Sequence, residues 1–298
     1  MLCELGSCLF TGVIVRAALN NVEQPPDSEI PIPKYIWQIF FPPPGTAVIE
    51  HDFVHADAWI ELSPGYTYTL VGARAADAFI ADNFANRPEI ATAYHALTNP
   101  ALKSDFLRYL LLYIHGGVYS DVDTKPVVRL DDWIPPEKRR QVKFLVAVEY
   151  DESLDPHPDD FTYKVQFCQW TIAAAPGHVV FGRMIDRVLE GLRDVAAAQG
   201  TTLDMAEITN YNVLNTTGPV AWTEVVFRLL QEMDPNIKSY DDVSQIREPW
   251  YLGDTVVMPL ETFRADYLDE WRVSWRKGRK ALVRHFFKGG WKKNPEQT

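Results

Sequence analysis

Residues 103–123 of the chain read KSDFLRYLLLYIHGGVYSDVD, and this stretch decides both the fold class and the chemistry. Apolar side chains recur at helical spacing between Leu102 and Ile114, which predicts a helix. A Gly-Gly turn then leads into a short apolar strand that ends in the acidic sequence Asp121-Val122-Asp123. Helices that alternate with strands indicate an α/β fold, in which ligands bind beyond the carboxyl ends of the strands.

The acidic end of this strand indicates a cation site. Successive side chains of a strand point to opposite faces, so Tyr119, Asp121 and Asp123 are expected to share one face. Two carboxylates held side by side repel each other, and a hard divalent cation relieves that repulsion. Such cations often bridge a few carboxylates to substrate phosphates. The motif therefore favours an enzyme that binds a sugar linked to a nucleoside diphosphate.

The composition restricts the class of protein. The chain has 298 residues, of which 47% are hydrophobic and 23% are charged, as expected of a globular protein with one substantial core. Its formal net charge of −11 argues against a general nucleic-acid binder, which usually carries a basic field. Basic residues gather between Trp271 and Lys293, either as a solvated tail or as an element that closes over a diphosphate or a membrane surface.

Strands and helices are predicted to alternate along the chain. The predicted strands cover residues 35–40, 66–70, 117–123, 144–148 and 165–173. The predicted helices cover residues 52–62, 75–84, 101–114, 178–195 and 221–233. Residues 281–291 are predicted as a closing strand or turn. This order favours a single α/β layer fold with a largely parallel sheet.

The first 29 residues are interpreted as an N-terminal segment and linker, followed by one domain over residues 30–298. A membrane-spanning helix needs about 20 predominantly apolar residues. Glu4 and Arg16 interrupt the apolar run here, so the segment is a weak or truncated signal anchor or simply a first helix. Asn215 begins an N-glycosylation sequon whose occupancy the sequence does not decide.

Several short motifs follow one another in a fixed order. They are IPKYIWQ (32–38), NPALKSDFLRY (99–109), GGVYSDVD (116–123), QW (169–170) followed by APGH (175–178), TGP (217–219), and VRH (283–285) followed by GGW (289–291). Together they resemble the glycosyltransferases with a "sugar-binding region containing DXD motif". Within these, the motifs are closest to the fungal initiating α-1,6-mannosyltransferases of the N-glycan outer chain. The resemblance covers residues 30–293.

The resemblance implies a GT-A-type fold, with a Rossmann-like nucleotide-binding half on a mixed, mostly parallel sheet and an acceptor-binding half. It also implies Mn²⁺ or another divalent metal at the donor diphosphate. Asp121, Asp123 and His285 would be the metal ligands. Asp121, Asp123 and Arg108 would carry the catalytic chemistry.

The resemblance further implies the residues that bind the donor. They are Asp105, Arg108, Tyr119, Asp121, Trp37, Gly290 and Trp291. For several of them a structural role is the alternative. Asp105 and Arg108 are neighbours on a helix and are either donor-positioning residues or a surface ion pair. Trp37 either packs on the nucleobase or lies in the core, and Gly290 stands where the family usually has Ser.

The reaction that the resemblance implies is the retaining transfer of a hexose, most specifically mannose from GDP-mannose, to a glycan or glycolipid acceptor. Relatives that use inositol phosphoceramide or UDP-sugars provide one alternative. A non-catalytic protein that binds metal or glycan on the same fold provides another. The family's fungal members place the catalytic domain in the Golgi lumen, with membrane attachment through the N-terminus. The sequence does not decide the acceptor, the linkage or the oligomeric state.

Overall fold

The computed structural model describes residues 7–10, 13–16, 31–42, 53, 55–154, 161–265 and 281–286. The strands are β1 (Ser7–Phe10), β2 (Val13–Arg16), β3 (Tyr35–Ile39), β4 (Thr67–Val71), β5 (Gly117–Ser120), β6 (Thr124–Pro126), β7 (Phe144–Asp151), β8 (Val165–Phe167), β9 (Thr171–Ala174), β10 (Trp250–Leu252), β11 (Thr255–Met258), β12 (Phe263–Ala265) and β13 (Val283–His285). The α-helices are α1 (Ala56–Glu61), α2 (Ala73–Asn83), α3 (Pro88–Ala96), α4 (Pro100–His115), α5 (Val179–Ala198), α6 (Asn210–Thr216) and α7 (Pro219–Met233).

The central sheet is mixed and confirms the predicted α/β class. Its order is β10-β11-β7-β9-β5-β3-β4, and β8 pairs with β7. β4, β3, β5, β7 and β11 run in one direction, whereas β9, β8 and β10 run in the other. The carboxyl ends of β3, β4 and β5 therefore meet at the same edge, where an α/β sheet binds its ligands.

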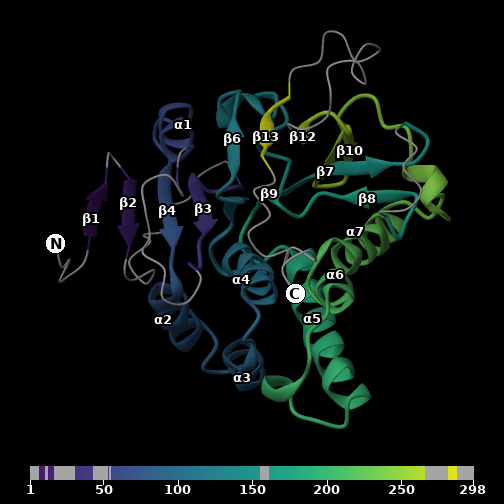
Figure 1. The fold of residues 1–298 in the computed structure, drawn as a ribbon. Coiled ribbons are helices and arrows are strands. Elements are labelled where there is room, and N and C mark those ends of the chain that lie inside the picture. Colours follow the sequence, from purple (N-terminus) through teal and green to yellow (C-terminus); the bar gives the residue numbers. More distant parts are fainter. Residues whose placement is uncertain are drawn as a thin grey trace.

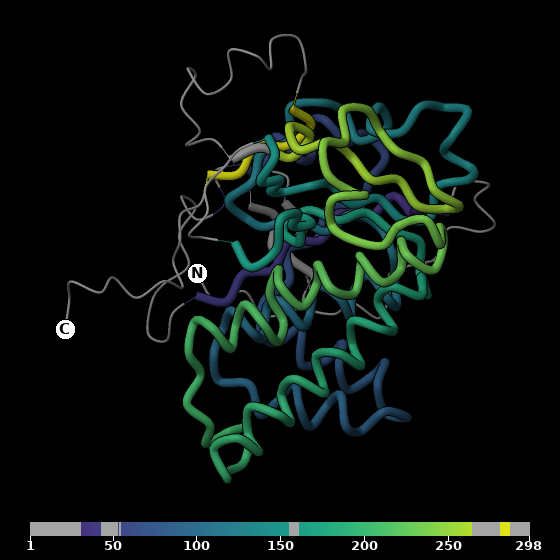
Figure 2. Tube along the Cα trace, turned by 90° about the vertical axis from the view of Figure 1, so that its right-hand side faces the viewer, coloured from purple at the N-terminus to yellow at the C-terminus, as the bar shows by residue number. Residues whose placement is uncertain are grey.

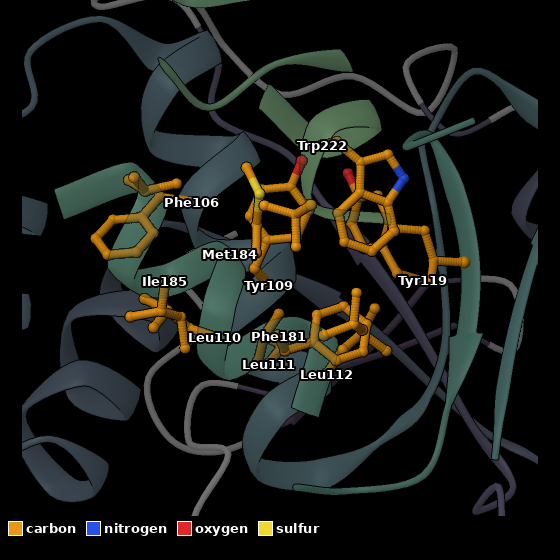
Figure 3. Packing of buried hydrophobic residues seen from close by; sticks show 14 of the residues in the cluster. Phe106, Tyr109, Leu110, Leu111, Leu112, Tyr119, Phe181, Met184, Ile185 and Trp222 are labelled. Atoms are coloured by element: carbon orange, nitrogen blue, oxygen red, sulfur yellow. The ribbon is translucent and has the colours of Figure 1, made fainter. Parts of the chain in front are cut away.

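A hydrophobic core fills the space between the sheet and the helices α2 to α5 and α7. In Figures 1 and 2 helices α2 to α5 lie in the lower part of the molecule, away from β12 and β13 at the top, and α7 lies higher, next to β8. Figure 3 shows how α4 contributes Tyr109 to Leu112, which face Phe181 and Met184 of α5 and Trp222 of α7. The rings of Tyr109 and Trp222 stack with centroids 5.3 Å apart. This helix-side core fixes α4 against the sheet.

A second core lies on the other face of the sheet. It contains Ile36, Tyr68 and Val118 from the strands, together with Trp59 of α1 and Trp133. Alternate residues of β3 thus enter opposite cores, because Trp37 lies among the helix-side residues and Ile36 among those of this outer core. Both faces of β3 and β5 are covered, as in other α/β sheets.

Two glycines join α4 to β5. Gly116 ends the helix with φ 63° and ψ −159°, and Gly117 follows with φ 97°. A Cβ on Gly116 would lie 2.7 Å from the carbonyl oxygen of Ala174, and one on Gly117 would lie 2.7 Å from that of Tyr35. The Gly-Gly pair is therefore required both by the backbone conformation and by the close approach of neighbouring strands.

A small three-stranded sheet brings the end of the described chain back to β5. β13 pairs parallel with β12 and antiparallel with β6, and His285 lies opposite Thr124. The amide of Phe286 donates to the carbonyl of Asp123 at 2.9 Å. The closing strand predicted within 281–291 is present at Val283–His285, directly beside the acidic turn.

The structure differs from the prediction in two places. The single strand predicted over 165–173 is two strands, β8 and β9, separated by residues 168–170, because β8 pairs with β7 whereas β9 pairs with both β5 and β7. At the N-terminus the structure forms an antiparallel pair, β1 and β2, in place of a helix. Among the described residues, none of the helices is both long and apolar enough to cross a membrane.

Candidate active site

The acidic sequence lies in a turn beyond β5. The strand ends at Ser120, and the amide of Thr124 donates to the carbonyl of Asp121 at 3.2 Å. Tyr119 and Asp121 meet as expected, since the Tyr119 hydroxyl donates to Oδ1 of Asp121 at 2.6 Å. Asp123 does not follow strand alternation, because the chain has already turned. The turn, and not the strand, sets the position of the second carboxylate.

Asp121, Asp123 and His285 come together as the sequence predicts. Nε2 of His285 lies 3.0 Å from Oδ1 of Asp123 and 3.9 Å from Oδ2 of Asp121. One ligand atom from each of the three side chains lies within 4.8 Å of the others. The pairing of β13 with β6 brings His285 here from a position 162 residues beyond Asp123.

This cluster suits a hard divalent cation. Carboxylate oxygens are the ligands that Mg²⁺ and Mn²⁺ prefer, and imidazole is compatible with a transition metal. The surroundings are also acidic. Asp105 and Asp121 lie beside the guanidinium of Arg108, Asp123 contacts His285, and Glu149 interacts electrostatically with His285 and Asp121. A bound cation would offset this excess of negative charge.

Asp105 and Arg108 form a buried ion pair on α4. Their side chains are only 8% and 5% exposed, and Nη2 of Arg108 lies 2.6 Å from Asp105. The same nitrogen is 3.5 Å from Oδ1 of Asp121, and Nη1 donates to the carbonyl of Gln169 at 3.1 Å. The guanidinium also lies over the ring of Tyr119 at 4.7 Å. The surface ion pair that the sequence left open is therefore excluded.

Burial shifts the titration of these groups. Loss of solvent raises the pKa of Asp105 to about 6, against the opposing effect of Arg108. Burial likewise raises the pKa of Tyr119 well above its ordinary value. The Tyr119 hydroxyl therefore stays protonated near neutral pH and keeps its hydrogen bond to Asp121. Arg108 is the fixed positive charge to which the surrounding carboxylates orient.

Gln169, Tyr109 and Thr217 support this pair from three segments. The Tyr109 hydroxyl lies 2.6 Å from Oε1 of Gln169 and 2.9 Å from the carbonyl of Thr217. The Thr217 hydroxyl donates to Asp105 at 3.1 Å. Tyr109 and Gln169 belong to two of the sequence motifs, which assign them no individual role. Their contacts join residues 60 and 108 positions apart in the sequence, which no local pattern reveals.

Trp170 and Glu149 lie behind the cation ligands. The amide of Asp121 donates to the carbonyl of Trp170 at 2.9 Å, and the Trp170 ring stacks on His285 with centroids 4.6 Å apart. The indole N–H of Trp170 donates to Oε1 of Glu149 at 2.8 Å, and Gln166 donates to Oε2 at 2.9 Å. Burial raises the pKa of Glu149. No local sequence pattern predicts that these two side chains meet.

Trp37 is the one described candidate that the structure places away from the site. Its side chain is fully buried in the helix-side core, and its indole N–H donates to the carbonyl of Gly116 at 2.7 Å. Its ring stacks on His115. Trp37 is therefore a core residue. Because side chains alternate between the two faces of β3, the Trp37 side chain lies between the sheet and α4. Gly290 and Trp291 lie outside the described residues, as does most of the basic run.

Comparison with known proteins supports the resemblance that the motifs indicate. Residues 52–140 match the family described as "Glycosyltransferase sugar-binding region containing DXD motif". The "Initiation-specific alpha-1,6-mannosyltransferase" of Schizosaccharomyces pombe is 31% identical over 265 residues. The protein of the same description in Candida albicans is 26% identical over 294 residues. The resemblance stated from the motifs is confirmed.

The extent of these matches differs. The aligned region covers 88% of this chain and 64% of the S. pombe relative, so the chain spans less than two thirds of that protein's length. For the C. albicans relative the corresponding shares are 90% and 74%. Among solved structures, the "PaToxG Glycosyltransferase" has a TM-score of 0.49 at 16% identity, and the match covers 70% of this chain and 73% of that one.

Proposed function

We propose that the protein is a metal-dependent retaining glycosyltransferase, because residues 52–140 match the family of DXD-containing glycosyltransferases. The observation that carries this proposal is the meeting of Asp121, Asp123 and His285 next to the buried Asp105–Arg108 pair. The substrates would be a nucleotide-sugar donor and a glycan or glycolipid acceptor.

Asp121, Asp123 and His285 would hold Mn²⁺ or another divalent cation at the donor diphosphate. The cation would supply electrostatic stabilisation of the charge that develops on the leaving group. Arg108 contributes a permanent positive charge that Asp105, Gln169 and the ring of Tyr119 hold in place. A guanidinium fixed in this way can bind the donor without reorganising when the reaction begins.

A front-face mechanism accounts for retention at this site. The bond between the anomeric carbon and the diphosphate oxygen breaks, and the acceptor oxygen forms its bond to that carbon on the same face. The acceptor proton moves to the departing phosphate oxygen. Both oxygens of Glu149 already accept hydrogen bonds, from Trp170 and Gln166, which makes Glu149 a poor nucleophile for double displacement. Trapping a glycosyl group covalently on Glu149 would contradict this mechanism.

Mannose from GDP-mannose is the donor we propose. The support is the mannosyltransferase activity by which the two fungal relatives are described, whose similarity extends over most of this chain. An outer-chain N-glycan is the corresponding acceptor, and lumenal residence in the Golgi is the corresponding location. Another donor on the same fold is the alternative that the experiment below distinguishes.

The test is donor hydrolysis across a panel of GDP- and UDP-sugars, with Mn²⁺ and with chelator. The wild type, Asp123→Ala and Asp204→Ala are compared, because Asp204 is an exposed acid outside the cluster. We expect Mn²⁺-dependent release of GDP from GDP-mannose that Asp123→Ala abolishes and Asp204→Ala retains. Turnover of a UDP-sugar alone would reject mannose transfer but keep the enzyme class. Nucleotide binding without turnover, with acceptors present, would indicate a non-catalytic protein.

A further inference from the structure

The carbonyl oxygen of Asp121 is an unusual acceptor, because side chains from two directions donate to it. Nε2 of Gln38 donates to it at 2.8 Å, and the hydroxyl of Thr124 donates to it as well. The amide of Thr124 makes a third contact at 3.2 Å. A carbonyl oxygen has two lone pairs, so this one is fully engaged. The peptide between Asp121 and Val122 is thereby fixed in orientation.

Both side-chain contacts continue into longer chains of hydrogen bonds. On one side, the hydroxyl of Tyr68 donates to Oε1 of Gln38. On the other side, the hydroxyl of Ser120 lies 2.8 Å from that of Thr124 and 2.6 Å from that of Thr171. These five side chains come from β4, β3, β5, β6 and β9, and they cross the sheet beneath the acidic turn. We call them the polar chain: Tyr68, Gln38, Ser120, Thr124 and Thr171.

The direction of each hydrogen bond follows from counting protons. A hydroxyl carries a single proton, and Thr124 uses its proton on the Asp121 carbonyl. Thr124 must then accept from Ser120, and Ser120 in turn must accept from Thr171. The donors therefore run from Thr171 through Ser120 and Thr124, and from Tyr68 through Gln38, toward one oxygen. Hydrogen bonds in such a chain polarise and strengthen one another.

Burial shows that the polar chain has to be satisfied as a unit. Gln38 is 1% exposed, Tyr68 is 5% exposed, and Ser120, Thr124 and Thr171 have no exposed surface. Buried polar groups cost free energy unless they are hydrogen-bonded. Not every buried hydroxyl is satisfied in this way, since those of Thr69 on β4 and Tyr94 on α3 have no hydrogen-bond partner among the described residues. The connection of five hydrogen-bonded side chains to the Asp121 carbonyl is thus a specific feature of this turn.

We propose that the polar chain holds the Asp121–Asp123 turn in the conformation that binds the divalent cation, with Gln38, Tyr68 and Thr124 as positioning residues. This inference rests on the proposed function, because it assigns the cation to Asp121, Asp123 and His285. None of the five side chains is itself a proposed ligand. They act on the ligands through the main chain, at the point from which both carboxylates project.

The chain offers a matched control for each test variant. Tyr68→Phe and Thr124→Val remove one hydroxyl from the polar chain. Tyr94→Phe and Thr69→Val remove buried hydroxyls that have no hydrogen-bond partner in the part of the chain that the structure describes. The dissociation constant of Mn²⁺ is measured on the full chain from the electron paramagnetic resonance signal of free Mn²⁺, without donor or turnover. Amide hydrogen exchange of residues 117–126 reports the order of the turn in the same variants.

We expect Tyr68→Phe and Thr124→Val to weaken Mn²⁺ binding by about tenfold or more, as substitutions behind metal ligands typically do. Exchange of the turn amides should accelerate in these variants and stay unchanged in Tyr94→Phe and Thr69→Val. Mn²⁺ affinities within twofold of the controls would overturn the inference, even where thermal stability falls. If Thr124→Val fails to fold, Tyr68→Phe decides. A wild type that does not bind Mn²⁺ would overturn both the cation assignment and this inference.

Discussion

Replacing Gly116 by Ala should destabilise the fold much more than the same change at Gly177. Gly116 has φ 63° and ψ −159°, a region that is essentially restricted to glycine and costs other residues about 1–3 kcal/mol. The added Cβ would also lie 2.7 Å from the Ala174 carbonyl oxygen and 2.7 Å from the Pro176 nitrogen. Both are backbone atoms that cannot rotate away, and such overpacking adds about 1–3 kcal/mol. The two effects together give roughly 2–6 kcal/mol.

Gly177 separates these two effects. Its φ is also positive, at 68°, but a Cβ there would meet no atom of the described residues within 4 Å. Gly177→Ala should therefore cost only the backbone term of about 1–2 kcal/mol. Urea unfolding of both variants, followed by tryptophan fluorescence and compared at equal slope, measures the difference. The precision of such comparisons is about 1 kcal/mol. If the free energies of unfolding of Gly116→Ala and Gly177→Ala differ by less than this, the reasoning is refuted, because β5 and β9 would then move apart easily.

Three further predictions follow from individual side chains. Trp37→Phe should lower the free energy of unfolding, measured with urea, by about 2–4 kcal/mol, because the ring becomes smaller and the Gly116 carbonyl loses its partner. Nucleotide affinity, measured by calorimetry, should stay unchanged. Weaker nucleotide binding would place Trp37 at the donor site. Burial lowers the pKa of His178, so stability should fall as pH drops below about 6.5, where the unfolded histidine gains its proton first. His178→Asn keeps an acceptor for the Val180 amide, and its unfolding midpoint should decrease less between pH 7.5 and pH 5 than that of the wild type. An equal decrease would show that other groups cause the pH dependence. Arg108→Lys should reduce donor turnover by roughly 10- to 100-fold, which corresponds to the loss of one hydrogen bond to a charged group. The control Arg183→Lys changes a half-exposed side chain and should leave turnover unchanged. Equal activities of the two variants would show that the planar guanidinium of Arg108 is not needed.

Local periodicity was sufficient to predict the elements that build the site. The helix expected at 101–114 is α4, Pro100–His115, because its apolar stripe faces one core and Asn99 caps its first turn. The Gly-Gly turn is also where the motif predicted it, and the following strand begins at Gly117 as predicted but ends at Ser120, three residues before the predicted end. Asp105, Arg108, Tyr119 and Asp121 then come together, since one helix carries the first two, and the adjacent strand and the turn that follows it carry the others.

What the sequence did not predict depends on contacts between distant segments. The break at residues 168–170 follows from β8 and β9 having different partners, which an apolar run cannot express. Trp37 reads equally well as a core residue or as a ligand contact until its neighbours are known. Gln38 carries no signal beyond being a polar residue inside an apolar strand. In each case the deciding partner lies dozens of residues away.

The arrival of His285 on the last described strand has a consequence for protein synthesis. Asp123 and its neighbours leave the ribosome long before the histidine, which follows 162 residues later. At about 5–20 residues per second, that interval lasts roughly 8–30 seconds. During this time the nascent chain can assemble β3, β4 and β5 but has only the two carboxylates of its cation cluster. The ligand set becomes complete only after His285 has been synthesised, so nascent chains that stop before this residue would lack the histidine.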